Sequence, residues 1–368
     1  MISGKGMFLW KIYLCEGGNV ETIANLAQQA GLSHVLIKIA DGTNIYNYDW
    51  TNHRDLVPPL VSALRARGIH PWGWHYIYGR DPAGEATVAA QRMQQLGLDG
   101  YVIDAEMEFE ASGMDKAART FMITLRNQMP AGVPIGLSSF RFPSYHPAFP
   151  WNEFLSRCDF NMPQVYWVTA HNPADQLIRS VREFQAMFPD QPIAATGSAY
   201  KYGTWVPSAS EIQTFMSTAV KLGLLGVNFW EWHFTRALDP SIWRAIATFS
   251  WPSSPQPQPQ DITEAYIAAL NTHDPDKVVA LYTDRAVHVN TARTVTGKEA
   301  IRSWYVSLFN DILPNATFRL TGRSGTGNSR HFTWEATSSA GSVRNGNDVF
   351  GLLDDKIAYH YTFFTVER

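Results

Sequence analysis

GYVIDAEMEFE, residues 100–110, combines a short apolar run bounded by glycine with carboxylates at every second position from Asp104. Such a run is typical of a buried parallel strand. If the strand continues to Glu106, alternation places Val102, Asp104 and Glu106 on one face. The stretch therefore predicts two carboxylates side by side at the C-terminal end of a strand. The alternative is a solvated acidic loop just beyond the strand.

Paired carboxylates have a characteristic chemistry. Two like charges this close repel, and the repulsion raises the pKa of one of them. This is a usual way to place a general acid beside an ionised partner. Glu106 and Asp104 are therefore the candidate catalytic residues.

Short apolar runs alternate with longer amphipathic segments on both sides of this stretch. Eight strand–helix units in about 250 residues predict an α/β fold, a (β/α)8 TIM-type barrel spanning 1–250. A doubly wound sheet is the alternative, but no Gly-x-Gly-x-x-Gly follows the first strand. The predicted strands cover 8–14, 34–40, 69–78, 101–106, 134–140, 159–167, 192–199 and 225–232. The predicted helices cover 20–30, 55–67, 85–96, 115–129, 151–157, 174–188, 208–222 and 240–249.

The pattern changes after the segment WPSSPQPQPQ, residues 251–260, which predicts a semi-rigid Pro/Gln-rich linker. Helices come first in 261–368 and most strands follow, which is typical of a small α+β domain. The expected helices are 262–271, 276–282 and 297–311. The expected strands are 287–290, 317–322, 330–337, 342–353 and 356–366.

The composition narrows the function classes. Apolar residues make up 45% of the 368, charged residues 17%, and the net charge is −3. Because Lys and Arg do not cluster, neither nucleic acid nor an anionic membrane is expected as the main partner. Cys15 and Cys158 make neither a disulfide framework nor a metal site, so no metal or cofactor is expected. The chain has no apolar run of membrane-spanning length and no signal-peptide pattern, which predicts a cytoplasmic location by default.

The N-terminal part resembles the glycoside hydrolase family 25 lysozymes over about 230 residues. The matching blocks are VLIKIADGT at 35–43, ARGI at 66–69 with WHY at 74–76, QVY at 164–166 and NFW at 228–230. Asp104-Ala105-Glu106 is similar to the family's Asp-x-Glu, which implies that Glu106 is the acid and that Asp104 assists. The family's first strand also carries an Asp. Here 7–12 reads MFLWKI, with no carboxylate before Glu16, which leaves open a divergent or catalytically inactive relative.

Candidate substrate-binding residues lie at the predicted strand ends, each with a structural alternative. Lys38 is either a partner for Asp104 or a lysine that extends to solvent, and His75 is either a site residue or a buried core histidine. Trp230, on a face with Trp232 and Asn228, either stacks on a pyranose ring or packs under the linker. The full set is Lys38, Asp41, His75, Tyr76, Gln164, Tyr166, Trp230 and Glu231.

The C-terminal part resembles the SnoaL-like domains of the NTF2-like superfamily. The supporting blocks are YIAAL at 266–270 with His273-Asp274, GKEAI at 297–301, DVF at 348–350 and DKI at 355–357. The resemblance implies a curved sheet around a cone-shaped pocket, and frequent dimers. The acid–base candidates are His288, His331, Asp348 and His360, and the expected pocket residues are Trp304, Asp348 and His360, with Phe350 and Phe364. The alternative is a cone used for packing or dimerisation.

The sequence thus predicts a lysozyme-like glycoside hydrolase that cleaves an amino-sugar polymer such as peptidoglycan. Two alternatives stay open: a catalytically decayed glycan-binding barrel with a dimerising second domain, and small-molecule binding or isomerisation in the cone. Tyr359, Tyr361 and Phe363 alternate along the last strand and predict a homodimer through that face. Residues two apart on a strand lie roughly 6.6 Å apart, which leaves the stereochemical outcome of cleavage undecided.

Overall fold

The structure is a computed structural model that describes residues 2–252, 261–325 and 327–367. The chain divides into two compact units, Met1–Gln258 and Pro259–Arg368. Most of the predicted linker, residues 253–260, lies outside the described residues.

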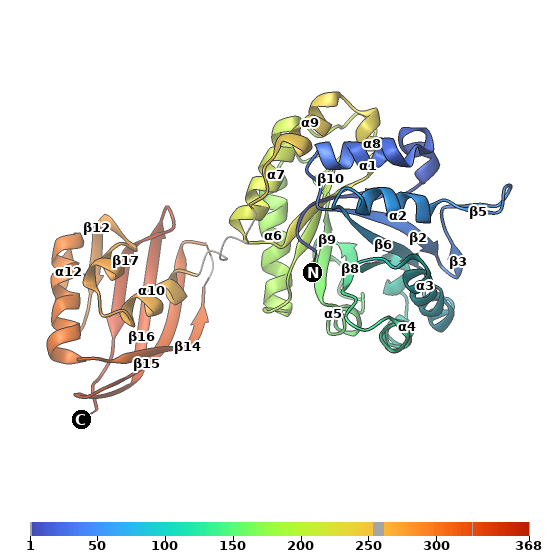
Figure 1. The fold of residues 1–368 in the computed structure, drawn as a ribbon. Coiled ribbons are helices and arrows are strands. Elements are labelled where there is room, and N and C mark those ends of the chain that lie inside the picture. Colours follow the sequence, from blue (N-terminus) through green and yellow to red (C-terminus); the bar gives the residue numbers. More distant parts are fainter. Residues whose placement is uncertain (1, 253–260, 326, 368) are drawn as a thin grey trace. The chain divides into compact units, whose positions relative to one another are not determined.

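The first unit is a closed barrel of eight parallel strands surrounded by helices (Figure 1). The first strand pairs with both the second and the last, which closes the sheet into a cylinder. This confirms the predicted (β/α)8 architecture. The strands are β1 (Gly4–Leu9), β2 (His34–Asp41), β6 (His70–Ile77), β7 (Tyr101–Ala105), β8 (Ile135–Phe140), β9 (Phe160–Val165), β10 (Ala194–Ser198) and β11 (Gly226–Trp230).

The first strand begins four residues earlier than expected and ends at Leu9. The strand includes the buried Lys5, whose ammonium donates to the carbonyls of Ala30, Ile246 and Phe249 at 2.6–2.9 Å. These bonds replace water and make burial of the charge tolerable. Residues expected to end the strand instead form the 3₁₀ turn η1 (Ile12–Gly18).

The helices start and end with the expected chemistry. Ser208 and Glu211 form a capping box, and the Asp239 side chain accepts from the Ser241 N–H, as is typical of these residue types at helix starts. The barrel helices are α1 (Val20–Gln29), α2 (Val57–Arg65), α3 (Pro82–Leu96), α4 (Met114–Gln128), α5 (Trp151–Leu155), α6 (Pro173–Met187), α7 (Ala209–Lys221), α8 (Trp232–Ala237) and α9 (Pro240–Thr248), with 3₁₀ turns η2 (Met107–Glu110) and η3 (Pro143–Tyr145).

Strand alternation divides the barrel core in two. Outward residues such as Tyr101, Ile103 and Ala105 pack under the helices in the main core. Inward residues fill the cylinder itself, as expected for a barrel of this size. This inner cluster contains Phe8, Leu36, Trp72, Trp74, Val102, Phe160 and Met162, with Trp10, Tyr76 and Trp230 partly buried beside it.

Residues 42–56, between β2 and α2, contain three short strands that the sequence did not predict. These are β3 (Asn44–Ile45), which pairs antiparallel with β2, and the hairpin of β4 (Tyr48–Asp49) and β5 (Arg54–Asp55). Asn47 takes a left-handed conformation with φ 56° between β3 and β4. Its buried amide ties the segment to the ends of the first two barrel strands.

The second unit is a six-stranded sheet with helices against one face (Figure 1). The strand order is β13-β12-β17-β16-β15-β14. The helices are α10 (Ile262–Leu270), α11 (Pro275–Val279) and α12 (Lys298–Ser307), followed by a π-turn η4 (Leu308–Ile312). The strands are β12 (Tyr282–Val289), β13 (Thr294–Thr296), β14 (Thr317–Ser324), β15 (Ser329–Ser338), β16 (Gly341–Leu353) and β17 (Lys356–Phe363).

The first two strands of this unit differ from the prediction. Tyr282 begins β12 rather than ending a helix, because α11 stops at Val279 and Tyr282 pairs with Ile357 of β17. The short edge strand β13 was missed, because three residues are too few for alternation to be visible. Among the described residues, no helix is long and apolar enough to cross a membrane.

Candidate active site at the barrel mouth

Asp104 and Glu106 come from the C-terminal end of β7. Asp104 lies in register with Tyr76 of β6 and Ser138 of β8, and only 4% of its surface is exposed. Glu106 follows the strand directly, at the N-cap of η2, and is half-buried. The inward positions of a barrel strand converge on the mouth, which is where barrel enzymes place their chemistry.

One amide links the two carboxylates. Gln164, at the inward end of β9, donates from Nε2 to Asp104 Oδ1 at 2.9 Å and to Glu106 Oε1 at 3.0 Å. The Ser138 hydroxyl lies 3.2 Å from the same nitrogen. The two carboxylate oxygens can be no farther apart than the sum of the two bonds. The amide therefore holds one oxygen of Asp104 close to one oxygen of Glu106.

The environment favours the protonated forms of both carboxyls. Burial raises the pKa of Asp104 well above its ordinary value, and the charge of Glu106 raises it further, while Lys38 and Gln164 oppose the shift. Burial also raises the pKa of Glu106, with the Gln164 hydrogen bond opposing and Glu108 adding. The pair therefore retains a proton at a pH where exposed carboxyls have lost theirs.

Lys38 stands beside this pair but is bonded elsewhere. Its Nζ lies 2.6 Å from Asp41 Oδ2, and the Tyr78 hydroxyl donates to the other oxygen of Asp41 at 2.7 Å. The ammonium also lies over the rings of Trp74 and Tyr46, at 4.8 and 4.5 Å. The structure thus pairs Lys38 with Asp41 rather than with Asp104. Asp41, three residues further along the chain, provides the negative charge beside the ammonium.

Tyr76 and Glu108 form a further polar pair at the mouth. The Tyr76 hydroxyl donates to Glu108 Oε2 at 2.8 Å. Burial raises the pKa of Tyr76, and this bond to Glu108 adds to the shift. Glu108 was not among the expected substrate-binding residues, although the two-residue spacing of the acidic stretch was the signal that could have included it.

Aromatic rings make up much of the remaining wall. Trp230, at the end of β11 and half-buried, has its ring centroid 5.5 Å from Phe8 and 5.4 Å from Trp74. Tyr166, just past β9, lies edge-on to Tyr200 at 5.5 Å. Burial raises the pKa of Tyr166, and the charges of Asp104 and Glu106 add to the shift. Both residues lie at the C-terminal ends of their strands.

His75 does not reach the mouth, which corrects the expectation for this residue. Alternation directs its side chain outward, where it is fully buried with Nδ1 2.9 Å from the Tyr101 hydroxyl and Nε2 2.7 Å from the Gly42 carbonyl. Burial lowers its pKa to about 4. His75 is therefore a neutral core residue between the barrel wall and the helices.

Glu231 and Trp232 follow the end of β11 at Trp230, and both are buried at the start of α8. Glu231 is buried at the N-cap of α8 and accepts from the Phe234 N–H at 2.8 Å. Trp232 is the first residue of that helix and packs against Trp243. The expectation that both tryptophans share a face with Asn228 is wrong for Trp232, because α8 begins at this residue and the alternation of the strand ends before it.

The second unit holds a separate buried polar network. Asp348 is fully buried and accepts from Trp334 Nε1 at 2.9 Å and from the Thr362 hydroxyl at 2.5 Å, while His360 Nε2 lies 2.9 Å from its other oxygen. The Tyr282 hydroxyl lies 2.6 Å from His360 Nδ1. From there the chain of contacts continues through Tyr305 to Tyr266 at 2.6 and 2.9 Å.

His288 differs from its neighbours in this network. It is fully buried, and neither ring nitrogen has a hydrogen-bond partner among the described residues. Its ring lies 4.6 Å from that of His360 and 5.6 Å from that of Trp304. Burial lowers the pKa of His288 to about 2, with His360 and Arg293 adding. His331, by contrast, is exposed on β15, so it does not line the interior.

In the described ranges, His, Cys, Asp and Glu side chains do not form a group of three that could hold a metal ion. Residues 263–360 match the family model of the SnoaL-like domain. No curated protein sequence matches the chain.

Among solved structures, the spore cortex-lytic enzyme SleL of Bacillus cereus covers 67% of this chain and 75% of its own, at 12% identity and a TM-score of 0.52. A SnoaL-like family protein of Agrobacterium tumefaciens covers 28% of this chain and 94% of its own, at 24% identity and a TM-score of 0.26. An NTF2-like protein of Cytophaga hutchinsonii covers 31% and 95%, at 12% identity and 0.26.

At 12% identity, the likeness to SleL concerns the fold alone, and it agrees with the strand pairing of the first unit. The match at 263–360 agrees with the sheet and helices of the second. The chain is a closed (β/α)8 barrel followed by a SnoaL-like domain.

Proposed function

We propose that the barrel is a glycoside hydrolase of lysozyme type that cleaves an amino-sugar polymer such as peptidoglycan. The observation that carries the proposal is the Asp104–Glu106 pair, bridged by Gln164 at the mouth of the barrel. Most enzymes that hydrolyse glycosidic bonds use a pair of carboxyl groups, one of them a general acid. The name of SleL, a spore cortex-lytic enzyme, is consistent with a polymer substrate.

In this proposal Glu106 is the general acid. It is half-buried, and its raised pKa keeps it protonated until it transfers that proton to the leaving glycosidic oxygen. The ionised form that remains then takes a proton from the water that completes hydrolysis. Neighbouring Glu108 lies near enough to influence both carboxyls, but its own side chain accepts from Tyr76.

Asp104 assists from the same strand. Both carboxyls come from the end of one strand, so we place them on one side of the bound sugar. The nucleophile that attacks the anomeric carbon from the opposite face then has to be another group. The acetamido oxygen of an amino sugar is suited to this step: it attacks the anomeric carbon as the leaving bond breaks, and Asp104 accepts the acetamido N–H. Substrate assistance of this kind is an established exception to the two-carboxylate scheme, and it requires an N-acetylated sugar.

The aromatic wall suits a pyranose ring. Trp230 offers a half-buried face for stacking, and Tyr76 and Tyr166 offer hydroxyls near the two carboxyls. The test is to incubate the purified chain with peptidoglycan and with N-acetylglucosamine oligomers and to analyse the products by mass spectrometry. New reducing ends from either polymer are expected. Intact polymers after long incubation contradict the proposal.

A glycan-binding barrel without activity is favoured by one observation at β1. The residue just beyond its mouth end is Trp10, which packs on Trp230 at 6.3 Å, where the resembling family carries a carboxylate in this strand. If the chain with Asp104 and Glu106 unchanged binds the oligomers but does not cleave them, this second function is supported.

A third candidate function lies in the SnoaL-like domain. His288, with two unpartnered nitrogens beside the His360–Asp348 pair, favours proton transfer on a small molecule within the cone. Addition of a ligand that bonds to His288 should raise the melting temperature of the full chain. The effect should vanish in His288→Phe, and a ligand that still stabilises that variant would not be bound there.

A further inference from the structure

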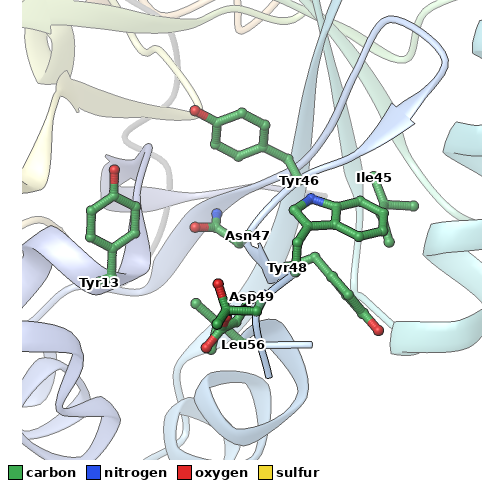
Figure 2. Close-up of a pocket in the computed structure, with 9 residues that line it drawn as sticks. Tyr13, Ile45, Tyr46, Asn47, Tyr48, Asp49 and Leu56 are labelled. Carbon is green, nitrogen blue, oxygen red and sulfur yellow. Dashed lines mark hydrogen bonds between the residues drawn. The ribbon is translucent and has the colours of Figure 1, made fainter. Parts of the chain in front are cut away.

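A second concave surface lies next to the barrel mouth, on the segment that follows β2. It is a pocket of about 470 Å³, within the range of roughly 300–1,000 Å³ typical of small-ligand sites. Tyr13 comes from η1 on one side, and Tyr46 and Tyr48 come from the segment after β2 on the other (Figure 2). No residue proposed for hydrolysis lines this pocket.

The pocket is rigidly joined to the mouth. Asn47 Nδ2 donates to the carbonyls of Trp10 and Lys38 at 3.0 and 2.8 Å, and Asn47 Oδ1 accepts from the Ile12 N–H at 2.8 Å. On the mouth side, the Tyr46 ring lies 4.5 Å from Lys38 Nζ. A ligand that extends from the mouth past Lys38 therefore meets the Tyr46 wall of the pocket.

Its lining has the chemistry of a sugar-binding surface. Trp50 and Tyr13 are 66% and 57% exposed, unusual for rings of that size, and Tyr48 lies beside Trp50 with centroids 4.6 Å apart and the ring planes tilted by 53°. The charged member of the described lining is Asp49, whose oxygens accept from the Thr51 and Asn52 N–H groups and the Asn52 amide and whose charge repels anions. Flat aromatic faces beside a carboxylate suit a neutral ring with many hydroxyls better than a phosphate or a lipid.

We infer that this pocket is a remote subsite that holds a pyranose unit of the same glycan whose scissile bond lies at Glu106. The inference rests on the proposed function. It adds that affinity grows with chain length, because only an oligomer long enough to pass Lys38 reaches Tyr13 and Trp50. A short oligomer occupies the mouth alone.

The test uses the full chain carrying Glu106→Gln, so that oligomers are bound without being cleaved. The dimer and the hexamer of N-acetylglucosamine are titrated calorimetrically into this parent, and into the same chain with Trp50→Ala, Trp50→Phe or Tyr359→Ala. Tyr359 is a matched control, as an aromatic 43% exposed on the other unit. Trp50 is mostly exposed, so its loss leaves the fold intact.

We expect Trp50→Ala to weaken hexamer binding about tenfold, the effect of losing one aromatic stacking contact. Dimer binding should be unchanged, Trp50→Phe should retain most of the hexamer affinity, and Tyr359→Ala should match the parent. Equal hexamer affinity in Trp50→Ala and the parent overturns the inference alone, as does an equal loss for both oligomers. A parent that binds neither oligomer overturns the proposed function and this inference with it.

Discussion

The barrel mouth and the interior of the SnoaL-like domain both contain buried carboxylates, but these have different hydrogen-bond surroundings. At the mouth, Asp104 and Glu106 share one amide donor and keep further lone pairs free, and Glu106 is in part accessible. In the second unit, Asp348 is fully buried and is bonded to Trp334, His360 and Thr362.

The difference lies in how many donors each carboxylate has and whether solvent reaches it. A buried carboxylate with several donors is satisfied and stabilises the fold around it. One that shares a donor with a second carboxylate is destabilised, and its pKa rises. Catalysis needs the shared-donor arrangement of the barrel mouth, which lowers the stability of the fold. The fully bonded Asp348 carries no such cost.

Substitution of Glu106 should have the largest effect. Glu106→Gln removes the proposed acid but retains the oxygen that accepts from Gln164, so activity on N-acetylated oligomers should fall about 100- to 10,000-fold with little change in melting temperature. Glu110→Gln is the matched control, because Glu110 is bonded to His146 in the same segment. An enzyme that keeps most of its activity without Glu106 would place the acid elsewhere, with Glu108 the next candidate.

Asp348→Ala should be the most destabilising change in the second unit. It leaves the Trp334, His360 and Thr362 donors buried without their acceptor, which costs on the order of 3 kcal/mol or more. Calorimetry should show a lower transition for that unit and unchanged glycan hydrolysis. Glu335→Ala is the control, since its ion pair with Arg319 is exposed and contributes little. A simultaneous loss of hydrolysis would contradict the separation of the two sites.

Asp104→Asn should lower activity yet stabilise the barrel. The folded-state pKa of Asp104 is raised, so the folded chain binds more protons than the unfolded one, and wild-type stability falls as the pH rises above the ordinary value of about 3.9. Asp104→Asn cannot ionise at this position, so its stability does not fall in this way as the pH rises. Its melting temperature should therefore exceed that of the wild type by more at pH 8 than at pH 4, on the order of 2–4 °C for each kcal/mol gained. A gap independent of pH would argue against a strained Asp104.

The smallest expected effect concerns assembly. Tyr359, Tyr361 and Phe363 are 38–43% exposed on one face of β17, while His360 and Thr362 face the core. We expect a fragment of residues 261–368 to dimerise through this face and Tyr361→Glu to shift it towards monomer in sedimentation experiments. Lys298→Glu, on α12, should leave the dimer unchanged. A fragment that stays monomeric at high concentration would end this proposal.

Short-range patterns account for what could be predicted from the sequence. Glycine-bounded apolar runs locate the barrel strands, and alternation correctly directs Asp104 inward. The same rule would have placed His75 outward, since it neighbours two inward residues, but its position between Trp74 and Tyr76 suggested a sugar site. The end of β11 depends on where α8 begins, which alternation does not reveal for Glu231 or Trp232.

Long-range contacts account for what could not be predicted. Gln164 lies 60 residues from Asp104, and the Tyr282–Tyr305–Tyr266 contacts join two helices and a strand. The pocket formed by Tyr13 and Trp50 depends on the left-handed turn at Asn47. The spacing of residues in the sequence does not predict such long-range contacts, because each depends on how separate elements pack.

The central claim is that a glycan is cleaved at the Asp104–Glu106 pair. A crystal of Glu106→Gln soaked with an N-acetylated amino-sugar oligomer tests it most directly. The account predicts sugar density in the barrel mouth, with a glycosidic oxygen within hydrogen-bond distance of the side chain at position 106 and an acetamido nitrogen near Asp104. An oligomer ordered in the SnoaL-like domain, or in the barrel with its glycosidic oxygens away from position 106, would contradict it.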